Sequence, residues 1–228
     1  MEKNKIKAVI FDMDGVLIDS EMLYLEDLLK FVRTKNPKAA KEDLLGVVGR
    51  TARDTWLIVE KAAANGQNWE SLREEYRKQR TIYETIDYRS IFRKEAKDLI
   101  AHLKQRGYRL AVASSTKLSL VTRVLTENEI IEYFDQVVSG NMFERSKPDS
   151  EIYFYTAEKL RVCPEECLVI EDSTVGITAA SRAGMKIAAV IDERFGFDRS
   201  LADFEIETLG EVEECLKKLE ADGKAAAK

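Results

Sequence analysis

The chain of 228 residues contains one histidine and three cysteines, and this scarcity excludes several kinds of site. A single histidine, His102, cannot build a multi-histidine metal centre, and it argues against a histidine-based catalytic triad. Cys163 and Cys167 are four residues apart but have no other cysteine or histidine near them in the sequence, so we expect both to be structural. A sparse, odd number of cysteines without a secretory signal predicts a cytoplasmic protein.

Long apolar runs and an excess of positive charge are also missing. No run of 18 apolar residues is present, so the sequence predicts no membrane span. The start, MEKNKIKAVIF, is basic and then apolar like a signal peptide, but its apolar run is short and ends in the charged DMDG, which fits a buried strand better. The formal net charge is -5 and no basic block stands out, which argues against binding to nucleic acid. A small anionic substrate is compatible with this charge, because an acidic protein can still hold a local cationic pocket.

The composition is that of a globular protein, with 45% hydrophobic and 34% charged residues. Short apolar runs predict strands at residues 6–11, 109–113, 134–139, 167–170 and 186–191. Helical periodicity predicts helices that begin at Ser20 and near Val212, and others at 54–64, 69–85, 93–106, 118–128, 150–160 and 175–183. Ser20 and Ser150 are expected to cap their helices.

The alternation of strands and helices predicts an α/β fold, with a doubly wound, mostly parallel, Rossmann-like sheet. Between the first two predicted strands, a segment of about 70 residues has only helical patterns and interrupts this alternation. We therefore expect a core of residues 1–19 and 91–228, with an inserted all-helical cap domain at residues 20–90. The sequence gives no indication of the oligomeric state.

Polar residues follow four of the predicted strands. These segments are Asp12-Met13-Asp14-Gly15, Ser114-Ser115-Thr116-Lys117, Ser146-Lys147-Pro148 and Glu171-Asp172-Ser173. Ligands of open α/β sheets bind at the carboxyl ends of the strands, so we expect these side chains to converge on one edge. This convergence is the main evidence for a site, because no single one of the segments carries it alone.

The predicted cluster of carboxylates favours a metal and a phosphoryl group. Four acidic residues, Asp12, Asp14, Glu171 and Asp172, would repel one another unless a hard cation neutralised them, and oxygen ligands suit Mg²⁺. A metal beside Lys147 can position and neutralise a phosphoryl group. One carboxylate could then act as the nucleophile and another as the general acid.

These segments resemble the four motifs of the haloacid dehalogenase superfamily, in the branch with a small helical cap. DMDGVLIDS resembles the first motif, Ser114 the second, Lys147 the third and EDS the fourth. GITAASRAGM resembles the segment that follows the fourth motif, so the resemblance spans residues 6–191. It implies a phosphatase that hydrolyses small-molecule phosphate monoesters through an aspartyl-phosphate intermediate.

The resemblance also implies a role for each residue of the motifs. Asp12 would be the nucleophile, and Asp14 would protonate the leaving group and then activate water. Mg²⁺ would be held by Asp12, the backbone carbonyl of Asp14 and Asp172, with Glu171 assisting directly or through water. Ser114 would bind the phosphoryl group together with Ser115. Lys147 would pair with Asp12 and with the phosphate, and would keep the nucleophile ionised.

The chain departs from the branch in its third motif. Ser150 stands where a second proline is often found, and we expect no loss of activity from this change. Asp14 is present, whereas the dehalogenases lack this second acidic residue, which favours an oxygen leaving group over a halide.

Substrate-binding residues in the predicted cap are harder to identify. Arg50 and Arg53 lie near Gly49 in a predicted loop, where they could contact the substrate or be solvated. Tyr24 occupies the place of the cap histidine of β-phosphoglucomutase, so we favour hydrolysis over that sugar-phosphate mutase activity. A non-catalytic binding or regulatory protein is the remaining alternative, although none of the motif residues has been lost. The substrate is expected to be a small phosphorylated metabolite that the sequence does not identify.

Overall fold

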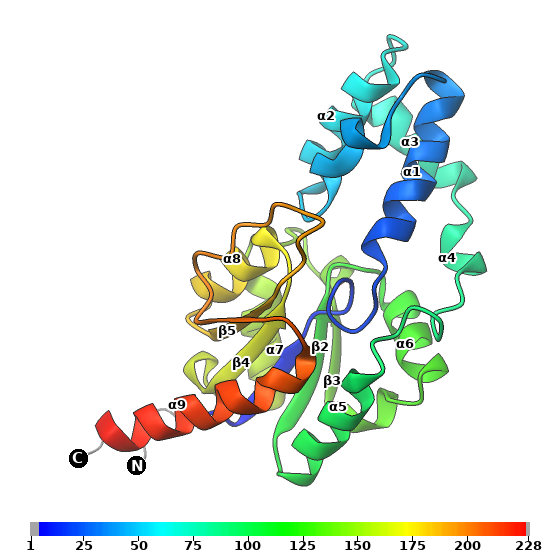
Figure 1. Cartoon of the computed structure of the whole chain (residues 1–228). Coiled ribbons are helices and arrows are strands. Elements are labelled where there is room, and N and C mark those ends of the chain that lie inside the picture. Colours follow the sequence, from blue (N-terminus) through cyan, green and yellow to red (C-terminus); the bar gives the residue numbers. More distant parts are fainter. Residues whose placement is uncertain (1–4, 227–228) are drawn as a thin grey trace. The chain divides into compact units, whose positions relative to one another are not determined.

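The computed structural model describes residues 5–226, and the side chains up to residue 221. Two compact units are formed: an α/β unit up to Asp19 and from Tyr88 onwards, and a helical unit at Ser20–Asp87. Figure 1 shows the helices and strands of both units in chain order. In the described part of the chain, no helix is both long enough and apolar enough to cross a membrane.

The α/β unit is built on a six-stranded sheet, and this confirms the predicted fold class. The strands are β1 Ala8–Phe11, β2 Arg109–Ser114, β3 Gln136–Ser139, β4 Cys167–Glu171, β5 Lys186–Val190 and β6 Phe204–Ile206. Their order in the sheet is β3-β2-β1-β4-β5-β6, and every neighbouring pair is parallel. The sequence did not predict β6, which is a three-residue strand at the edge of the sheet.

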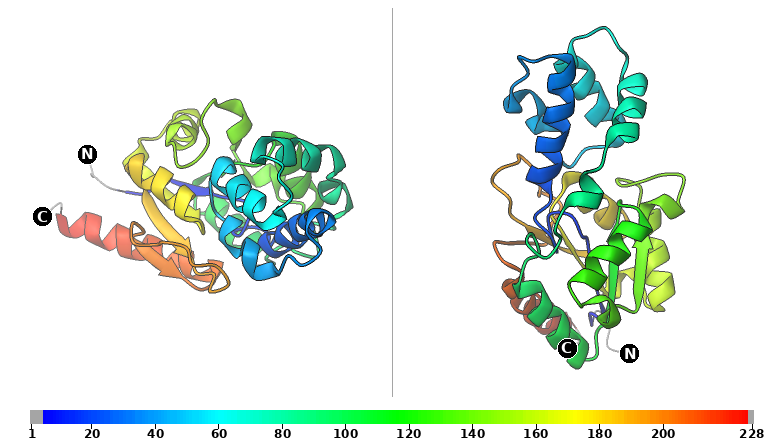
Figure 2. Two further views of the ribbon diagram at one scale, coloured as in Figure 1. Left: turned by 90° about the horizontal axis from the view of Figure 1, so that it is seen from above. Right: turned by 90° about the vertical axis from the view of Figure 1, so that its right-hand side faces the viewer.

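Helices cover both faces of this sheet (Figure 2). They are α5 Glu95–Gln105, α6 Leu118–Glu127, α7 Glu151–Leu160, α8 Thr174–Arg182 and α9 Val212–Ala226. One face packs against α7 and α8 in a single apolar cluster, which includes Ile10, Val169 and Ala180. In Figure 2, α5 and α9 lie on the opposite side of the sheet. Because both faces are covered, β1 is apolar at every position and fully buried.

The register of the central strands places the polar segments together. Phe11 of β1 is paired with Val112 of β2 on one side and with Ile170 of β4 on the other. The next residue along β1, Asp12, therefore lies between the ends of β2 and β4, and its backbone N–H donates to the Ile170 carbonyl at 2.9 Å. Parallel strands thus bring three of the predicted motifs to one edge of the sheet.

The helical unit has a core of its own. It contains α1 Glu21–Lys35, a 3₁₀ helix Lys41–Val47, α2 Ala52–Ala63, α3 Trp69–Gln79 and α4 Ile82–Thr85. Leu25, Leu28, Leu29 and Val32 form a buried apolar face of α1. The Phe31 ring of the same helix packs against the rings of Trp56 and Tyr76. The helix predicted at 69–85 is interrupted at Arg80, whose backbone is extended. The Arg80 guanidinium lies 3.7 Å from the Tyr83 ring centroid.

Both predicted serine caps are wrong. Ser20 and Ser150 precede their helices, but each has a helical backbone conformation and neither side chain makes a capping hydrogen bond. At α7 the neighbouring Asp149 provides the hydrogen bond to the first turn instead, since its Oδ1 accepts from the Glu151 N–H at 3.0 Å. An aspartate can satisfy the free N–H groups of a first helical turn as well as a serine can.

Candidate active site

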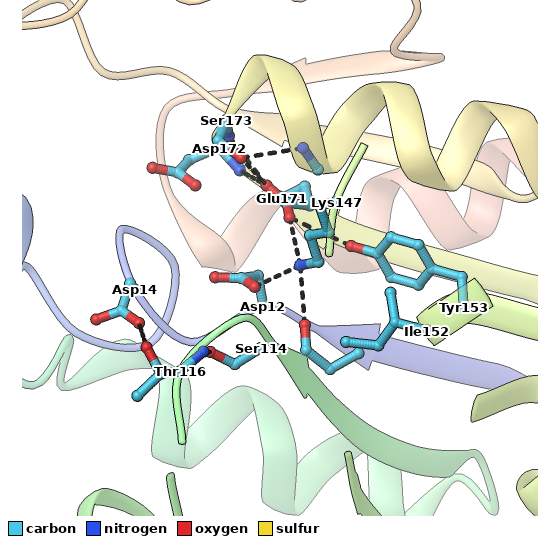
Figure 3. A network of polar contacts seen from close by, with 12 residues as sticks. Asp12, Asp14, Ser114, Thr116, Lys147, Ile152, Tyr153, Glu171, Asp172 and Ser173 are labelled. Atoms are coloured by element: carbon cyan, nitrogen blue, oxygen red, sulfur yellow. Dashed lines mark hydrogen bonds and ion pairs between the residues drawn. The ribbon is translucent and has the colours of Figure 1, made fainter. Parts of the chain in front are cut away.

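Lys147 is the centre of the polar network at the carboxyl edge of the sheet (Figure 3). Its Nζ donates to Asp12 Oδ1 at 2.6 Å, to Glu171 Oε1 at 2.7 Å and to the Ala113 carbonyl at 2.9 Å. These bonds use all three ammonium protons. The lysine side chain is only 3% exposed, so the ion pairs are shielded from water. Segments 24 and 135 residues away in the sequence are thereby tied to one ammonium group.

Burial and the lysine have opposite effects on the Asp12 carboxyl. Burial raises the pKa of Asp12, Lys147 lowers it, and the Glu171 and Asp14 carboxylates raise it again, so that it reaches about 7. Burial alone would lower the pKa of Lys147, but Asp12 and Glu171 outweigh this effect and raise it well above its usual range. The lysine therefore stays charged, and it allows Asp12 to ionise near neutral pH.

Glu171 accepts hydrogen bonds at both of its oxygens. Oε1 accepts from Lys147 and from the Tyr153 hydroxyl, the latter at 3.2 Å. Oε2 accepts from the N–H groups of Asp172 and Ser173 and from the Ser173 hydroxyl, at 2.9 to 3.0 Å. Burial raises the pKa of Glu171, but Lys147 and Ser173 lower it below its usual range. The carboxylate is held as an anion by five donors, and a direct bond to a metal would displace some of them.

Two glycines make room for the carboxylates of Glu171 and Asp172 at the end of β4. A Cβ on Gly176, in the first turn of α8, would lie 1.6 Å from Glu171 Oε1. A Cβ on Gly15 would lie 2.0 Å from Asp172 Oδ2, and the φ of +76° at Gly15 is itself unfavourable for other residues. The loop after β1 therefore lies directly against Asp172, as the convergence of the first and fourth motifs requires.

The end of β2 faces the other side of Asp12 in Figure 3. Thr116 connects the second motif to the first, because its hydroxyl donates to Asp14 Oδ2 at 2.7 Å and its N–H donates to Ser114 Oγ at 3.1 Å. Ser114 is 1% exposed, whereas Ser115 is exposed to solvent. The sequence pattern did not assign a role to Thr116, although it stands in the same Ser-Ser-Thr-Lys segment.

The oxygen groups at this edge fit Mg²⁺, though not through a cluster of side chains alone. Among the described residues, no group of three acidic, cysteine or histidine side chains could hold a metal ion. Mg²⁺ usually takes only one or two carboxylates and fills its other positions with waters and phosphate oxygens. Asp12 and Asp172 are both buried at this edge, and the Gly15 backbone lies against Asp172. This donor set suits such a site.

The helical unit contains a pocket of about 190 Å³. Tyr24 lines it, together with Trp56, Tyr76 and Arg80. The Arg80 guanidinium lies 5.2 Å from the Tyr24 ring centroid, so a cation and aromatic rings are combined in one wall. Arg50 and Arg53, for which the sequence left open substrate contact or solvation, are absent from its lining. The Arg50 Nε donates to the Gly46 carbonyl, and Arg53 is exposed.

Comparisons with known proteins agree with this geometry. The sequence profile of the haloacid dehalogenase-like hydrolases matches residues 9–190. A phosphorylated carbohydrates phosphatase of Thermotoga maritima is 32% identical over 200 residues, which cover 87% of this chain and 88% of that protein. The pyrophosphatase PpaX of Bacillus thuringiensis is 30% identical over 197 residues, which cover 82% and 83% of the two chains. A crystal structure of β-phosphoglucomutase from Clostridium difficile shares the fold, with a TM-score of 0.74 at 20% identity over 93% of this chain and 98% of that one.

Proposed function

This chain belongs to the haloacid dehalogenase-like hydrolases and is a phosphoric monoester hydrolase, and from this premise we propose that it hydrolyses phosphorylated carbohydrates, with Mg²⁺ and through a phosphoaspartate at Asp12. The observation that carries the proposal is the buried contact of 2.6 Å between Lys147 Nζ and Asp12 Oδ1, with Asp14 two residues further along. A carboxylate placed between a cation and a second carboxyl group is suited to act as a nucleophile beside a general acid.

The proposed reaction has two steps. An Asp12 carboxylate oxygen attacks phosphorus, the bond from phosphorus to the ester oxygen breaks, and Asp14 gives its proton to the departing alcohol. Asp14 then takes a proton from a water molecule, whose oxygen attacks the phosphoaspartate and releases inorganic phosphate and the Asp12 carboxylate. Lys147 is charged before the first step, because both of its carboxylate partners stabilise the ammonium. Glu171 remains its carboxylate partner while Asp12 carries the phosphoryl group. Ser114 would donate a hydrogen bond to a phosphoryl oxygen.

Asp12, Asp172 and the backbone carbonyl of Asp14 would hold the Mg²⁺. When bound, the ion would neutralise the charge of the phosphoryl group beside these carboxylates. Glu171 would support the site through its hydrogen bonds to the backbone of Asp172 and Ser173.

The proposed substrate class follows the name of the Thermotoga maritima relative. The name of the Bacillus thuringiensis relative is different, so relatedness of this degree does not fix the substrate. We propose that Tyr24 contributes to substrate selection, since it lines the pocket of the helical unit with Arg80. A sugar-phosphate mutase activity is the alternative, because a β-phosphoglucomutase shares the fold.

A substrate screen tests the proposal directly. Phosphate release would be measured on sugar phosphates, nucleoside monophosphates, phosphoglycolate, pyrophosphate and p-nitrophenyl phosphate. A coupled assay on sugar monophosphates would detect mutase activity. We expect the largest kcat/KM on a sugar phosphate, with free phosphate as the product. Isomerised sugar phosphate without free phosphate would establish the mutase activity. The absence of turnover on every substrate would contradict the proposed phosphatase activity.

Replacing Asp14 with asparagine is expected to slow alkyl phosphates far more than p-nitrophenyl phosphate. The alkoxide of a sugar needs a proton as it leaves, whereas p-nitrophenolate departs readily, and general acid catalysis is typically worth about 10²–10⁴-fold. Single-turnover kinetics are needed, because slow hydrolysis of the phosphoaspartate would otherwise mask the difference. Equal single-turnover losses for both substrates would show that Asp14 serves position or metal binding instead.

Removing the metal is expected to abolish turnover. Excess EDTA should stop phosphate release, and added Mg²⁺ should restore it. Ca²⁺ should inhibit, because its larger and looser coordination misplaces the phosphoryl group. Isothermal titration of the EDTA-treated and dialysed protein with Mg²⁺ would measure binding without turnover. Full activity in EDTA would contradict the proposed cofactor.

A further inference from the structure

The hydroxyl of Tyr153 lies in the catalytic network, although the reaction described above does not use it. Tyr153 is on α7, six residues after Lys147, and its side chain is fully buried. Its hydroxyl donates to Glu171 Oε1 at 3.2 Å, the same oxygen that accepts from Lys147. Its ring centroid lies 5.0 Å from Lys147 Nζ. Figure 3 shows the phenol pointing towards Glu171 from the side opposite Asp12.

Packing alone does not require this hydroxyl. The ring belongs to the apolar cluster between α7 and the sheet, which also contains Ile152 and Leu160 of the same helix. A phenylalanine would fill the same space there without a polar atom to satisfy. A buried hydroxyl is favourable only if it has a partner, and this one has found the carboxylate that pairs with the catalytic lysine.

The position of Lys147 depends on where Glu171 Oε1 is held. The ammonium has three acceptors and three protons, so a shift of one acceptor moves the group relative to the other two. Oε2 is fixed by the backbone at the start of α8, but the carboxylate can still rotate about that end. Tyr153 donates to Oε1, the oxygen that Lys147 also binds, and so restricts this rotation.

We propose that Tyr153 is a positioning residue, whose hydroxyl fixes Glu171 Oε1 and thereby holds the Lys147 ammonium on Asp12 Oδ1. The inference rests on the proposed function in so far as Asp12 is the nucleophile. Tyr153 does not contact the substrate in this role, so its loss should lower kcat and leave KM nearly unchanged.

The test compares Tyr153→Phe with Tyr108→Phe. Both changes remove only a hydroxyl that donates to a buried or partly buried glutamate, because Tyr108 donates to Glu220 Oε1 at 2.9 Å. Tyr108 precedes β2 and so lies at the end of the sheet opposite to the site. We expect kcat to fall by roughly 10- to 100-fold in Tyr153→Phe, as for other residues that orient a catalytic group, and to stay within about twofold in Tyr108→Phe.

A second readout needs neither substrate nor metal. The buried Lys147 ammonium should give a slowly exchanging ¹H–¹⁵N signal, which Lys147→Met identifies by its disappearance. This signal should persist in Tyr108→Phe and should broaden or shift in Tyr153→Phe. A kcat of Tyr153→Phe within about twofold of the control, or an unchanged lysine signal, would overturn the proposal.

The proposal stays testable if Tyr153→Phe does not fold or if no substrate is turned over. If Tyr153→Phe does not fold, cross-relaxation between the Lys147 ammonium and the Tyr153 ring protons takes its place, and its absence overturns the proposal. If no phosphate ester is turned over, the proposed function fails, whereas the lysine signal of the two variants still decides whether Tyr153 positions Lys147.

Discussion

Replacing Asp12 with asparagine is expected to lower turnover by about 10⁴-fold or more, because the amide cannot attack phosphorus. The fold should be retained, since asparagine has nearly the same shape. The matched control is Asp203→Asn, since Asp203 also pairs with a lysine at 2.6 Å, but this lysine is the exposed first residue of β5. Phosphate release by this control should equal that of the wild type. Residual activity of Asp12→Asn within tenfold of wild type would show that Asp12 is not the nucleophile.

The same substitution should change how stability depends on pH. Burial raises the folded-state pKa of Asp12 from 3.8 to about 7, so between these values the folded protein binds a proton that the unfolded chain has lost. The free energy of unfolding then decreases as pH rises through this window. Asp12→Asn has no such group, so its Tm relative to that of the wild type should rise from about pH 4 to pH 7. Thermal unfolding in excess EDTA measures this, and a constant difference across the window would contradict the raised pKa.

Such a result would mean that the nucleophile is kept at the expense of stability. A buried carboxylate that must ionise destabilises the fold, and the contact with Lys147 only partly compensates for it. The site is in this respect a place where local stability and function oppose each other.

The positions of the motif residues could be predicted from the sequence because the core of the sheet is simple. Strands such as Ala8–Phe11 are continuous apolar runs that end abruptly in charge, and a parallel sheet collects such ends at one edge. Four motifs in the expected order then indicated the chemistry. The pairing of Asp12 with Lys147 followed from the resemblance, and the structure places the two in contact.

The other contacts among these residues could not be predicted, because they depend on exact orientations of elements far apart in the sequence. The hydroxyl of Tyr153 reaches Glu171 only because α7 packs on the sheet with that face inwards, and in the sequence Tyr153 is one more apolar position of a helix. Thr116 likewise meets Asp14 across 102 residues. The edge strand Phe204–Ile206 was missed because three residues are too few for a pattern to show.

Helix ends were predicted less well than helix faces for a local reason. Ser150 precedes α7 and has the residue type of a cap, but its backbone is already helical, so its hydroxyl does not face the free N–H groups. Where the flanking residue is extended, as at Asn68 before α3, the side chain does accept from the helix, here from the Ser71 N–H at 2.9 Å. The backbone conformation before a helix depends on the preceding loop, which residue type alone does not determine.

Replacing Lys147 with methionine is expected to damage both stability and turnover. The change keeps the length of the side chain but leaves the Asp12 and Glu171 carboxylates buried together without their shared cation. Breaking a buried pair in this way typically costs about 3–5 kcal/mol, which urea unfolding can measure. The matched control is Lys186→Met at the exposed pair with Asp203, where a loss of about 0–1 kcal/mol and unchanged turnover are expected.

The loss of turnover in Lys147→Met should depend on pH in a defined direction. Burial raises the pKa of Asp12 and Lys147 opposes it, so removing the lysine must raise this pKa further. Asp12 then ionises only in more alkaline solution, and the acidic limb of the kcat/KM profile should move to higher pH. Turnover at neutral pH should fall by about 10²–10³-fold or more, because the charge that stabilises the phosphoryl group is lost as well. A stable Lys147→Met protein with an unmoved acidic limb would show that the lysine does not control the ionisation of Asp12.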